Sequence, residues 1–300
     1  MTDCAMQPRH SVRFQRNTFK EQTMRDLVAE FKALRLHGMA STWAEALETD
    51  GGANESVREA RSYIERLLEA EHTDRALRST AHQMAKARFP AHRDLAGFDF
   101  SGARVDRLLI EALASLEFTE AAHNVVFIGG PGTGKTHLAT ALGVAAIQRH
   151  GKRVRFVSTV DLVNALEAEK AQGKAGRLAM SLARLDILIL DDLGYLPFSQ
   201  AGGALLFHLL SKLYEHTSVL ITTNLTFAEW ANVFGDAKMT TALLDRLTHH
   251  CHIVETGNES YRFRHSSAQA KSRISARNSR AARRHHRLTQ RSHTQDQTRA

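Results

Sequence analysis

The sequence predicts an α/β protein in which a parallel five-stranded sheet with flanking helices follows a small all-helical domain and precedes a basic tail. Three observations support this fold class. Apolar residues repeat at helical spacing early in the chain, short β-branched runs alternate with amphipathic helices from Asn124 onward, and residues 266–300 lack aromatic side chains. With 43% hydrophobic and 24% charged residues, the chain of 300 residues has enough apolar material for a core, which excludes disorder along its whole length.

The first region has the pattern of a small helical bundle. Two apolar stripes repeat at spacings of three and four residues: Met24, Leu27, Phe31 and Leu34, then Val57, Ala60, Ile64 and Leu67. Thr42 and Ser56 are each followed three residues later by Glu, which is the spacing of a capping box. We therefore expect the second and third helices to begin there, separated by Gly51-Gly52.

The helical pattern breaks around Phe89-Pro90 and Gly97, where the segment LAGFDFSG is typical of a connection. The expected organisation is a flexible N-terminus over 1–17, a helical domain over 18–92, a second domain over 93–265 and a disordered basic tail over 266–300.

Five runs of strand length define the second domain. They are NVVFIG from Asn124, RVRFVS from Arg153, DILILDD from Asp186, SVLITTN from Ser218 and CHIVET from Cys251. Helical segments separate them at 136–150, 160–170, 200–214 and in a stretch that ends at Leu247. Strands joined by crossover helices form a parallel sheet covered on both faces, and ligands bind at the carboxyl ends of such strands.

A glycine-rich motif follows the first of these strands. Residues 129–136 read GGPGTGKT and satisfy G-x-x-x-x-G-K-[ST] between a predicted strand and a predicted helix. Glycines let the backbone N–H groups surround a phosphate, while Lys135 reaches the β- and γ-phosphates and the Thr136 hydroxyl binds Mg²⁺. A glycine-rich turn without a ligand is the alternative. The predicted ATP-binding residues are Gly129, Gly130, Pro131, Gly132, Thr133, Gly134, Lys135, Thr136 and His137.

Polar residues end two further strands. Asp191 and Asp192 close the apolar run DILILDD, where charge is costly unless a cation or a reacting water is bound. We expect Asp191 to hold Mg²⁺ and Asp192 to orient or deprotonate the water that attacks the γ-phosphate. Asn224 ends SVLITTN and could bridge the γ-phosphate and that water. Capping of the Leu193-Gly194 turn, and an ordinary turn residue at Asn224, are the structural alternatives.

Two features near the last strand have structural and functional interpretations. Arg246 lies among apolar residues in LLDRL and could act on a neighbouring subunit's γ-phosphate, although the local sequence alone favours pairing with Asp245 or with solvent. The run His249-His250-Cys251-His252 contains metal-ligand side chains. At a junction between helix and strand these side chains point in different directions, so packing and hydrogen bonding are expected instead.

Basic residues gather in two places. The tail 266–300 holds nine Lys and Arg residues against one acid, Asp296, and so accounts for the net charge of +8. It predicts either a nonspecific phosphate-binding arm or a solvated extension. In the segment 167–184 the candidate DNA-binding residues are Lys170, Lys174, Arg177 and Arg184, of which the first three share one face at helical spacing. The alternative is a solvated basic face.

Neither a signal peptide nor a membrane span is expected. The longest apolar runs, at 125–128 and 187–190, are far shorter than the ~20 residues that a bilayer requires. The two cysteines, Cys4 and Cys251, are too far apart in sequence to suggest a disulfide framework, which is typical of a reducing compartment. We expect a cytoplasmic protein without a membrane partner.

Several segments together resemble one family. They are GGPGTGKTHLA, LILDDLGYLP, ITTNL with FAEW and FGD, LLDRLTHHCHIVE, ESYRFR and, in the helical region, LRLHGMA. Their order resembles the IstB-like transposition helper ATPases, relatives of the helicase loader DnaC and the initiator DnaA in the AAA+ class. The similarity runs from about Thr18 to Arg264. The glycine-rich loop alone occurs in many unrelated NTPases, whereas the ordered set is specific.

The resemblance implies a P-loop NTPase (AAA+) fold without a C-terminal lid. It also implies ATP-dependent assembly on double-stranded DNA, a homo-oligomer with ATP at its subunit interfaces, and recruitment and stimulation of the transposase of the same element. In this family Arg246 matches the trans-acting arginine, segment 167–184 an extra helix that faces nucleic acid, and the helical domain a region that contacts the transposase and DNA. Asp192 departs from the Glu that is commoner in the wider class, which implies slow hydrolysis.

The expected activity is therefore that of an Mg²⁺-dependent, DNA-stimulated ATPase that serves as a DNA-binding helper of insertion-sequence transposition. A DnaC-like replicative helicase loader is the alternative within the class. A P-loop small-molecule kinase would instead carry a lid with arginines and a substrate pocket. A DNA-binding protein with a purely structural nucleotide would keep its binding after hydrolysis is lost.

Overall fold

The computed structural model describes residues 25–49 and 55–262, and the chain divides into two compact units between Arg75 and Ala76. We call them the helical unit, up to Arg75, and the sheet unit, from Ala76. The division falls within the long helix α3 (Glu55–Ala87), so it precedes the domain boundary expected near residue 92. The expected flexible N-terminus, the Gly51-Gly52 linker and the basic tail lie outside the described residues.

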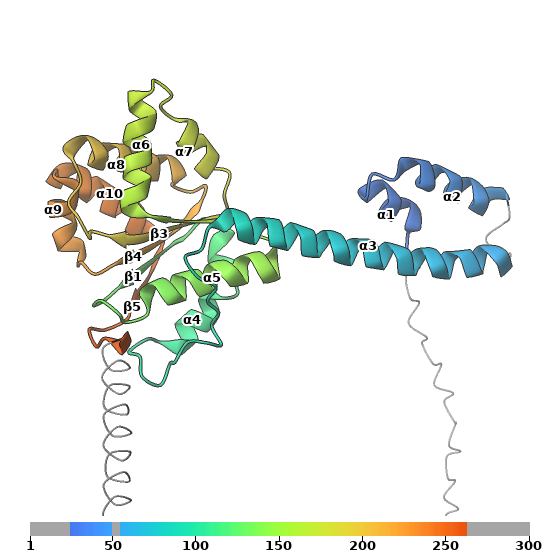
Figure 1. The fold of residues 1–300 in the computed structure, drawn as a ribbon, viewed down its shortest axis with the longest axis horizontal. Coiled ribbons are helices and arrows are strands. Elements are labelled where there is room, and N and C mark those ends of the chain that lie inside the picture. Colours follow the sequence, from blue (N-terminus) through green and yellow to red (C-terminus); the bar gives the residue numbers. More distant parts are fainter. Residues whose placement is uncertain (1–24, 50–54, 263–300) are drawn as a thin grey trace, which may run out of the picture. The chain divides into compact units, whose positions relative to one another are not determined.

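The sheet unit is built on five parallel strands in the order β2-β3-β4-β1-β5 (Figure 1). The strands are β1 (Asn124–Ile128), β2 (Val154–Ser158), β3 (Ile187–Leu193), β4 (Ser218–Thr223) and β5 (Cys251–Glu255). Each coincides with one of the five predicted runs, and the α/β fold class is confirmed. Because all the strands point the same way, the segments that follow them emerge at one edge of the sheet.

Helices cover both faces of this sheet (Figure 1). One face carries α4 (Arg107–Leu113) and α5 (Lys135–His150). The other carries α6 (Thr159–Ala171), α7 (Arg177–Leu182), α8 (Gln200–Leu213), α9 (Trp230–Phe234) and α10 (Ala237–His249). Two short 3₁₀ turns are η1 (Glu117–Thr119) and η2 (Phe227–Glu229). Along β1, Val125 and Phe127 pack toward α5 while Val126 packs toward α8, as the two-residue period of a strand requires.

The helical unit contains α1 (Leu27–Ala33), α2 (His37–Thr49) and the first part of α3. Its core is small and is formed by Leu27, Phe31, Leu34, Ala40, Trp43, Val57 and Leu68. The start predicted for the second helix at Thr42 is wrong, because α2 already begins at His37. The reason is a tight turn: Arg35 takes a left-handed φ of 60° and the Leu36 carbonyl then accepts the first helical bond, from Ala40. The third helix begins at Glu55, one residue before the predicted Ser56.

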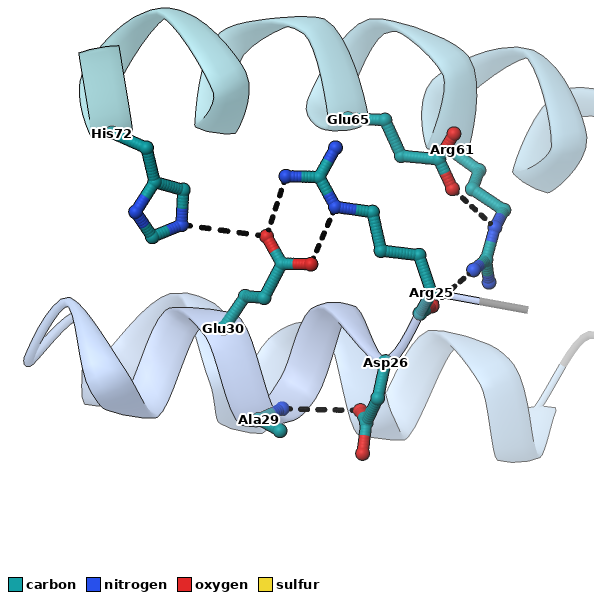
Figure 2. Close-up of polar contacts among 7 residues, drawn as sticks. All are labelled: Arg25, Asp26, Ala29, Glu30, Arg61, Glu65 and His72. Carbon is teal, nitrogen blue, oxygen red and sulfur yellow. Dashed lines mark hydrogen bonds and ion pairs between the residues drawn. The ribbon is translucent and has the colours of Figure 1, made fainter. Parts of the chain in front are cut away.

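Polar contacts on the surface join α1 to α3 (Figure 2). The Arg25 guanidinium donates to both carboxylate oxygens of Glu30, at 2.5 and 2.9 Å, and His72 of α3 lies 3.5 Å from the same carboxylate. Arg61 of α3 pairs with Glu65 at 2.9 Å and also donates to the Arg25 carbonyl. Exposed ion pairs of this kind each contribute at most about 1 kcal/mol.

Among the helices of the described ranges, none is long and apolar enough to cross a membrane. The longest, α3, has charged residues along its entire length.

Candidate functional site

The glycine-rich loop joins the end of β1 to the start of α5, which is the context predicted from the sequence. Gly132 and Gly134 have left-handed φ values of 75° and 102°, which L side chains rarely adopt. A Cβ atom at Gly134 would also lie only 2.5 Å from Cε2 of Phe98. The loop therefore needs glycine for its turn and for its close packing at the N-terminus of α5.

Lys135, the first residue of α5, is buried at the mouth of this loop. Its Nζ atom donates to the carbonyl oxygens of Gly129 and Gly130, both at 2.8 Å. Burial lowers the pKa of Lys135, while the charges of Asp192 and Asp191 act in the opposite direction. The side chain is thus a desolvated cation that points at the loop, where it can bind a phosphate oxygen.

Asp191 receives two hydroxyl bonds on one carboxylate oxygen. Thr136 donates to Oδ1 at 2.9 Å and Thr222, on β4, donates to the same atom at 2.6 Å. Burial raises the pKa of Asp191, the nearby charge of Asp192 raises it further, and the two hydroxyl bonds oppose this rise. A carboxylate and a threonine hydroxyl in contact are hard oxygen ligands of the type that Mg²⁺ prefers, so these residues fit the predicted metal role.

Asp192 faces the opposite way from Asp191. The register between β3 and β4 shifts between Leu190 and Leu193, and Asp192 takes a left-handed φ of 55°. Its backbone N–H donates to the Thr222 hydroxyl at 2.9 Å, and its carboxylate is exposed. A non-glycine residue held in this conformation is uncommon and marks a position that the surrounding structure determines. The bend turns Asp192 out of the sheet and toward the cavity.

A cavity of about 790 Å³ lies at the carboxyl edge of the sheet, a volume suited to a nucleotide. Of the predicted residues its wall contains Pro131, Gly132, Thr133, Gly134, Lys135, Thr136, His137, Asp192 and Asn224. Gly129, Gly130 and Asp191 stand behind this wall and accept hydrogen bonds from Lys135 and Thr136. The structure thus gathers the predicted ATP-binding and magnesium residues, together with Asp192 and Asn224, around one site.

Two further walls of the cavity were assigned no role from the sequence. One is the connection at 90–104, where the Phe98 ring makes edge contacts with Phe100 at 4.8 Å and with His137 at 5.3 Å between centroids. The other follows β5 and includes Thr256, Tyr261 and Arg262. The aromatic pair in GFDFSG and the motif ESYRFR were the available signals.

Arg246 lies away from the cavity of its own chain. The Asn124 side-chain amide, at the beginning of β1, donates to the Leu247 carbonyl at 3.2 Å, whereas the glycine-rich loop follows the end of that strand. The five residues of β1 separate the two ends by about 15 Å. The Arg246 guanidinium instead lies 5.8 Å from the centroid of the Phe207 ring. Arg246 is therefore not part of the cavity wall of its own chain.

The four basic candidates for DNA contact are all exposed. The expectation that Lys170, Lys174 and Arg177 share one helical face is wrong, because α6 ends at Ala171 and α7 begins at Arg177. Gly173 and Gly176 take left-handed φ values and turn the chain between the two helices. Lys174 lies in this turn and Arg184 follows α7, so each of the four residues lies on a different local structure.

The histidine run is packed through contacts between its imidazole rings and neighbouring side chains. The His250 ring stacks on His123 with centroids 4.8 Å apart, and no group of three or more His, Cys, Asp or Glu side chains that could hold a metal ion is found within residues 25–49 and 55–262. Burial raises the pKa of the neighbouring Cys251 to about 12, so this thiol stays protonated at neutral pH.

The strand, the glycine-rich loop, the following helix and the acidic end of β3 define a P-loop nucleotide-binding protein. The family model described as IstB-like ATP binding protein matches residues 29–269, and the chain belongs to this family. The ATP-binding protein of insertion sequence IS5376 from Geobacillus stearothermophilus is 35% identical over 248 residues, 82% of this chain and 97% of that protein. Its counterpart of insertion sequence IS21 from Pseudomonas aeruginosa is 38% identical over 205 residues, 68% and 77% of the two chains.

Solved structures of replication proteins are also similar. The DnaC helicase loader is 26% identical, with a TM-score of 0.45 over 50% of this chain and 86% of that chain. The replication initiator DnaA bound to AMPPCP and single-stranded DNA is 22% identical, with a TM-score of 0.47 over 56% of this chain and 51% of that chain.

Proposed function

We propose that this protein is an ATPase that helps insertion-sequence transposition: it assembles on duplex DNA with ATP bound and recruits and stimulates the transposase of the same element. One observation carries the ATPase part, namely the convergence of Lys135, the Asp191–Thr136 pair, Asp192 and Asn224 on a single cavity. The names of the relatives, ATP-binding proteins of insertion sequences, support the transposition part.

The chemistry follows from the positions of these groups. Lys135 neutralises charge on the β- and γ-phosphates, and Asn224 orients the γ-phosphate and a water molecule. Asp192 accepts a proton from that water as its oxygen bonds to the γ-phosphorus, and the bond to the ADP oxygen breaks to give ADP and phosphate. Thr136 and Asp191 would hold Mg²⁺, which supplies positive charge to the phosphates when it is bound.

Slow hydrolysis suits a switch that keeps the protein on DNA for a limited time. Asp192 has one methylene fewer than the Glu of the wider class, and its carboxylate is exposed rather than desolvated. The shorter side chain places its carboxylate less well against the attacking water, which slows hydrolysis.

Assembly completes the site in this proposal. Arg246 is exposed and lies away from its own cavity, so its contribution comes from the neighbouring subunit. Lys170, Lys174, Arg177 and Arg184 are exposed cations for DNA phosphates, and such contacts give affinity without choice of sequence. The helical unit is proposed as the region that contacts the transposase.

The experiment that tests the ATPase assignment compares wild type with Lys135→Ala and with Arg149→Ala, a control at the exposed last turn of α5. ATP affinity is measured by calorimetry, and hydrolysis is measured with and without duplex DNA. We expect Lys135→Ala to lose ATP binding or turnover while circular dichroism shows an intact fold. Unchanged affinity and turnover in Lys135→Ala would refute the assignment.

The transposition part is tested with the transposase of the same element. Strand transfer into duplex DNA should rise when wild-type protein and ATP are added, and Lys135→Ala should not raise it. If the protein instead loads a replicative helicase and leaves strand transfer unchanged, the helicase-loader alternative is correct.

A further inference from the structure

Two residues of β3 lie opposite a single residue of β4 at the carboxyl edge of the sheet. The pairing of the two strands is regular up to Leu190 and resumes at Leu193, while β4 advances by only two residues over the same interval. Asp191 and Asp192 therefore share one position on β4, which is Thr222. This is the residue count of a β-bulge, a feature that is rare between parallel strands and that redirects side chains next to active sites.

The Thr222 hydroxyl makes one hydrogen bond to each of the two acids. It accepts the backbone N–H of Asp192 at 2.9 Å and donates to Oδ1 of Asp191 at 2.6 Å. The direction of both bonds is fixed, because a backbone N–H can only donate and a hydroxyl carries a single hydrogen. Thr222 is fully buried and is not part of the cavity wall, so it can influence the cavity only through these acids.

The bulge depends on this hydroxyl at Asp192. The left-handed φ of 55° at Asp192 is a conformation that glycine adopts readily and other residues rarely do. The extra residue of a bulge is also left out of the ladder between the strands, and here the Asp192 N–H bonds to the Thr222 hydroxyl. Without that hydroxyl the N–H would lose its partner, and the conformation that turns the Asp192 carboxylate toward the cavity would lose a contact that holds it.

The same hydroxyl holds the other acid from the side of β4. Thr136 of α5 donates to the same Oδ1 atom of Asp191 at 2.9 Å, and the Thr159 hydroxyl donates to the Asp191 backbone carbonyl at 2.9 Å. Thr136 is itself a proposed Mg²⁺ ligand, whereas Thr222 has no other proposed role. The bond from Thr222 is therefore the one that can fix the Asp191 carboxylate whatever the Thr136 hydroxyl binds.

We propose that Thr222 is a positioning residue for ATP hydrolysis, whose one hydroxyl holds the bulge in β3 and thereby orients both acids. Asp191 is kept in contact with Thr136, and Asp192 is kept facing the cavity. This inference rests on the proposed ATPase function. Asn224 follows Thr222 by two residues, so a single strand would orient the acids and also carry the amide that faces the γ-phosphate.

The test uses the full chain with Thr222→Val, which keeps the shape of the side chain and removes the hydroxyl, and with Thr222→Ser, which keeps the hydroxyl. The matched control is Thr217→Val. Thr217 is also buried, and its hydroxyl donates to the Leu185 carbonyl at 3.1 Å at the other end of β4. For each protein we measure kcat, KM for ATP, the Mg²⁺ dependence of the rate and the melting temperature. Hydrogen exchange of residues 190–194 is followed without nucleotide.

Thr222→Val should lower kcat about 10- to 100-fold, the usual effect of removing a group that orients a metal ligand, and should need more Mg²⁺ for its half-maximal rate. KM for ATP should change little, because Lys135 keeps its contacts with the glycine-rich loop. Exchange at 190–194 should be faster in the nucleotide-free protein. Thr222→Ser should restore most of the rate, and Thr217→Val should lower the melting temperature without lowering kcat.

The variants separate failure of this proposal from failure of the ATPase assignment. Wild-type kcat in Thr222→Val would overturn the role of Thr222, and the ATPase assignment would stand as long as Lys135→Ala is inactive. Equal losses of kcat in Thr222→Val and Thr217→Val, or no recovery in Thr222→Ser, would show that the hydroxyl serves stability alone. Normal turnover in Lys135→Ala would remove both proposals. If Thr222→Val does not fold, Thr222→Ala removes the hydroxyl without placing a methyl group against Asp191, and its comparison with Thr222→Ser decides.

Discussion

The two units of the chain are stabilised in different ways. In the sheet unit the strands β1, β3 and β4 are buried on both faces, and side chains such as Phe127 and Ile189 are fully inaccessible. The helical unit has a small apolar cluster around Phe31, and its surface carries the Arg25–Glu30 and Arg61–Glu65 ion pairs (Figure 2). A parallel sheet covered by helices gives a rigid frame, whereas a few short helices leave little apolar area to bury.

Because of this difference, we expect substitutions at the site and substitutions in the helical unit to have different effects on activity and on stability. The groups that we propose to act on the nucleotide lie at the ends of buried strands, so they can be changed without disturbing the core that positions them. In the helical unit the residues that bury apolar surface are the same ones that hold the helices together. We therefore expect changes at the site to alter rates without unfolding, and changes in the helical unit to alter folding without changing ATP binding.

The largest expected effect concerns Arg246. Arg246→Ala should bind ATP nearly as wild type but hydrolyse it about 10³ to 10⁵ times more slowly, because arginines that act in trans contribute this much in other NTPases. Its exposed position, away from its own cavity, gives no reason for unfolding. The measurement is the DNA-stimulated ATPase rate together with thermal unfolding.

Mixing variants shows whether the arginine acts between subunits. A mixed assembly of Arg246→Ala and Lys135→Ala contains interfaces with an intact loop and an intact arginine, so part of the activity should return. A full-rate Arg246→Ala protein would remove Arg246 from the site. An inactive mixture whose co-assembly has been demonstrated would show that the arginine does not act in trans.

Asp192 gives the next largest effect. Asp192→Asn keeps the size of the side chain and should bind ATP, but turnover should fall about 10²- to 10⁴-fold because the general base is lost. Lifetimes on duplex DNA should lengthen in the presence of ATP. Single-turnover hydrolysis and DNA dissociation are measured, with Asp161→Asn in the first turn of α6 as the control. Normal turnover would exclude Asp192 as the base.

The sequence predicted the sheet unit better than the helical unit, and the two units show why. The strands coincide with short runs rich in β-branched residues, and the motif at 129–136 fixes its own context of strand, turn and helix. The start of α2 was missed because the left-handed turn at Arg35 has no glycine or proline to signal it. The break between α6 and α7 was missed despite Gly173, because the spacing of the basic residues alone fits a continuous helix.

The walls of the cavity were harder to predict for a different reason. Residues 256–262 reach the glycine-rich loop only because β5 pairs with β1, and that pairing joins residues far apart in the sequence. The bend at Asp192 likewise depends on the register shift against β4. Contacts of this type follow from the order of strands in the sheet, which the spacing of motifs along the chain does not contain.

Paired core truncations test the separation of the two units. Phe31→Ala and Phe127→Ala remove the same side chain from fully buried positions, one in each unit, and each should cost about 3–5 kcal/mol. Phe31→Ala should unfold the helical unit and leave the ATP affinity unchanged, whereas Phe127→Ala should weaken both folding and ATP binding. Hydrogen exchange resolved by segment measures the stability of each unit, and calorimetry measures the ATP affinity. Loss of ATP binding in Phe31→Ala would show that the units do not behave independently.

The smallest expected effect concerns the acid stability of the helical unit. The hydrogen bond from Arg25 lowers the pKa of Glu30 below its usual value, so the folded state binds this proton less readily than the unfolded state. The stabilisation is therefore complete above the unfolded pKa of about 4.3 and is lost as the pH falls through the lower folded value.

Glu30→Gln should flatten this part of the stability profile, whereas Glu48→Gln, an exposed control on α2, should not. Segment-resolved hydrogen exchange between about pH 3 and 6, at low and high salt, measures the difference between the stability profiles of wild type and Glu30→Gln. Added salt should reduce this difference because the Arg25–Glu30 pair is close to solvent. An identical profile for Glu30→Gln and wild type would mean that the apolar cluster alone holds the helical unit together.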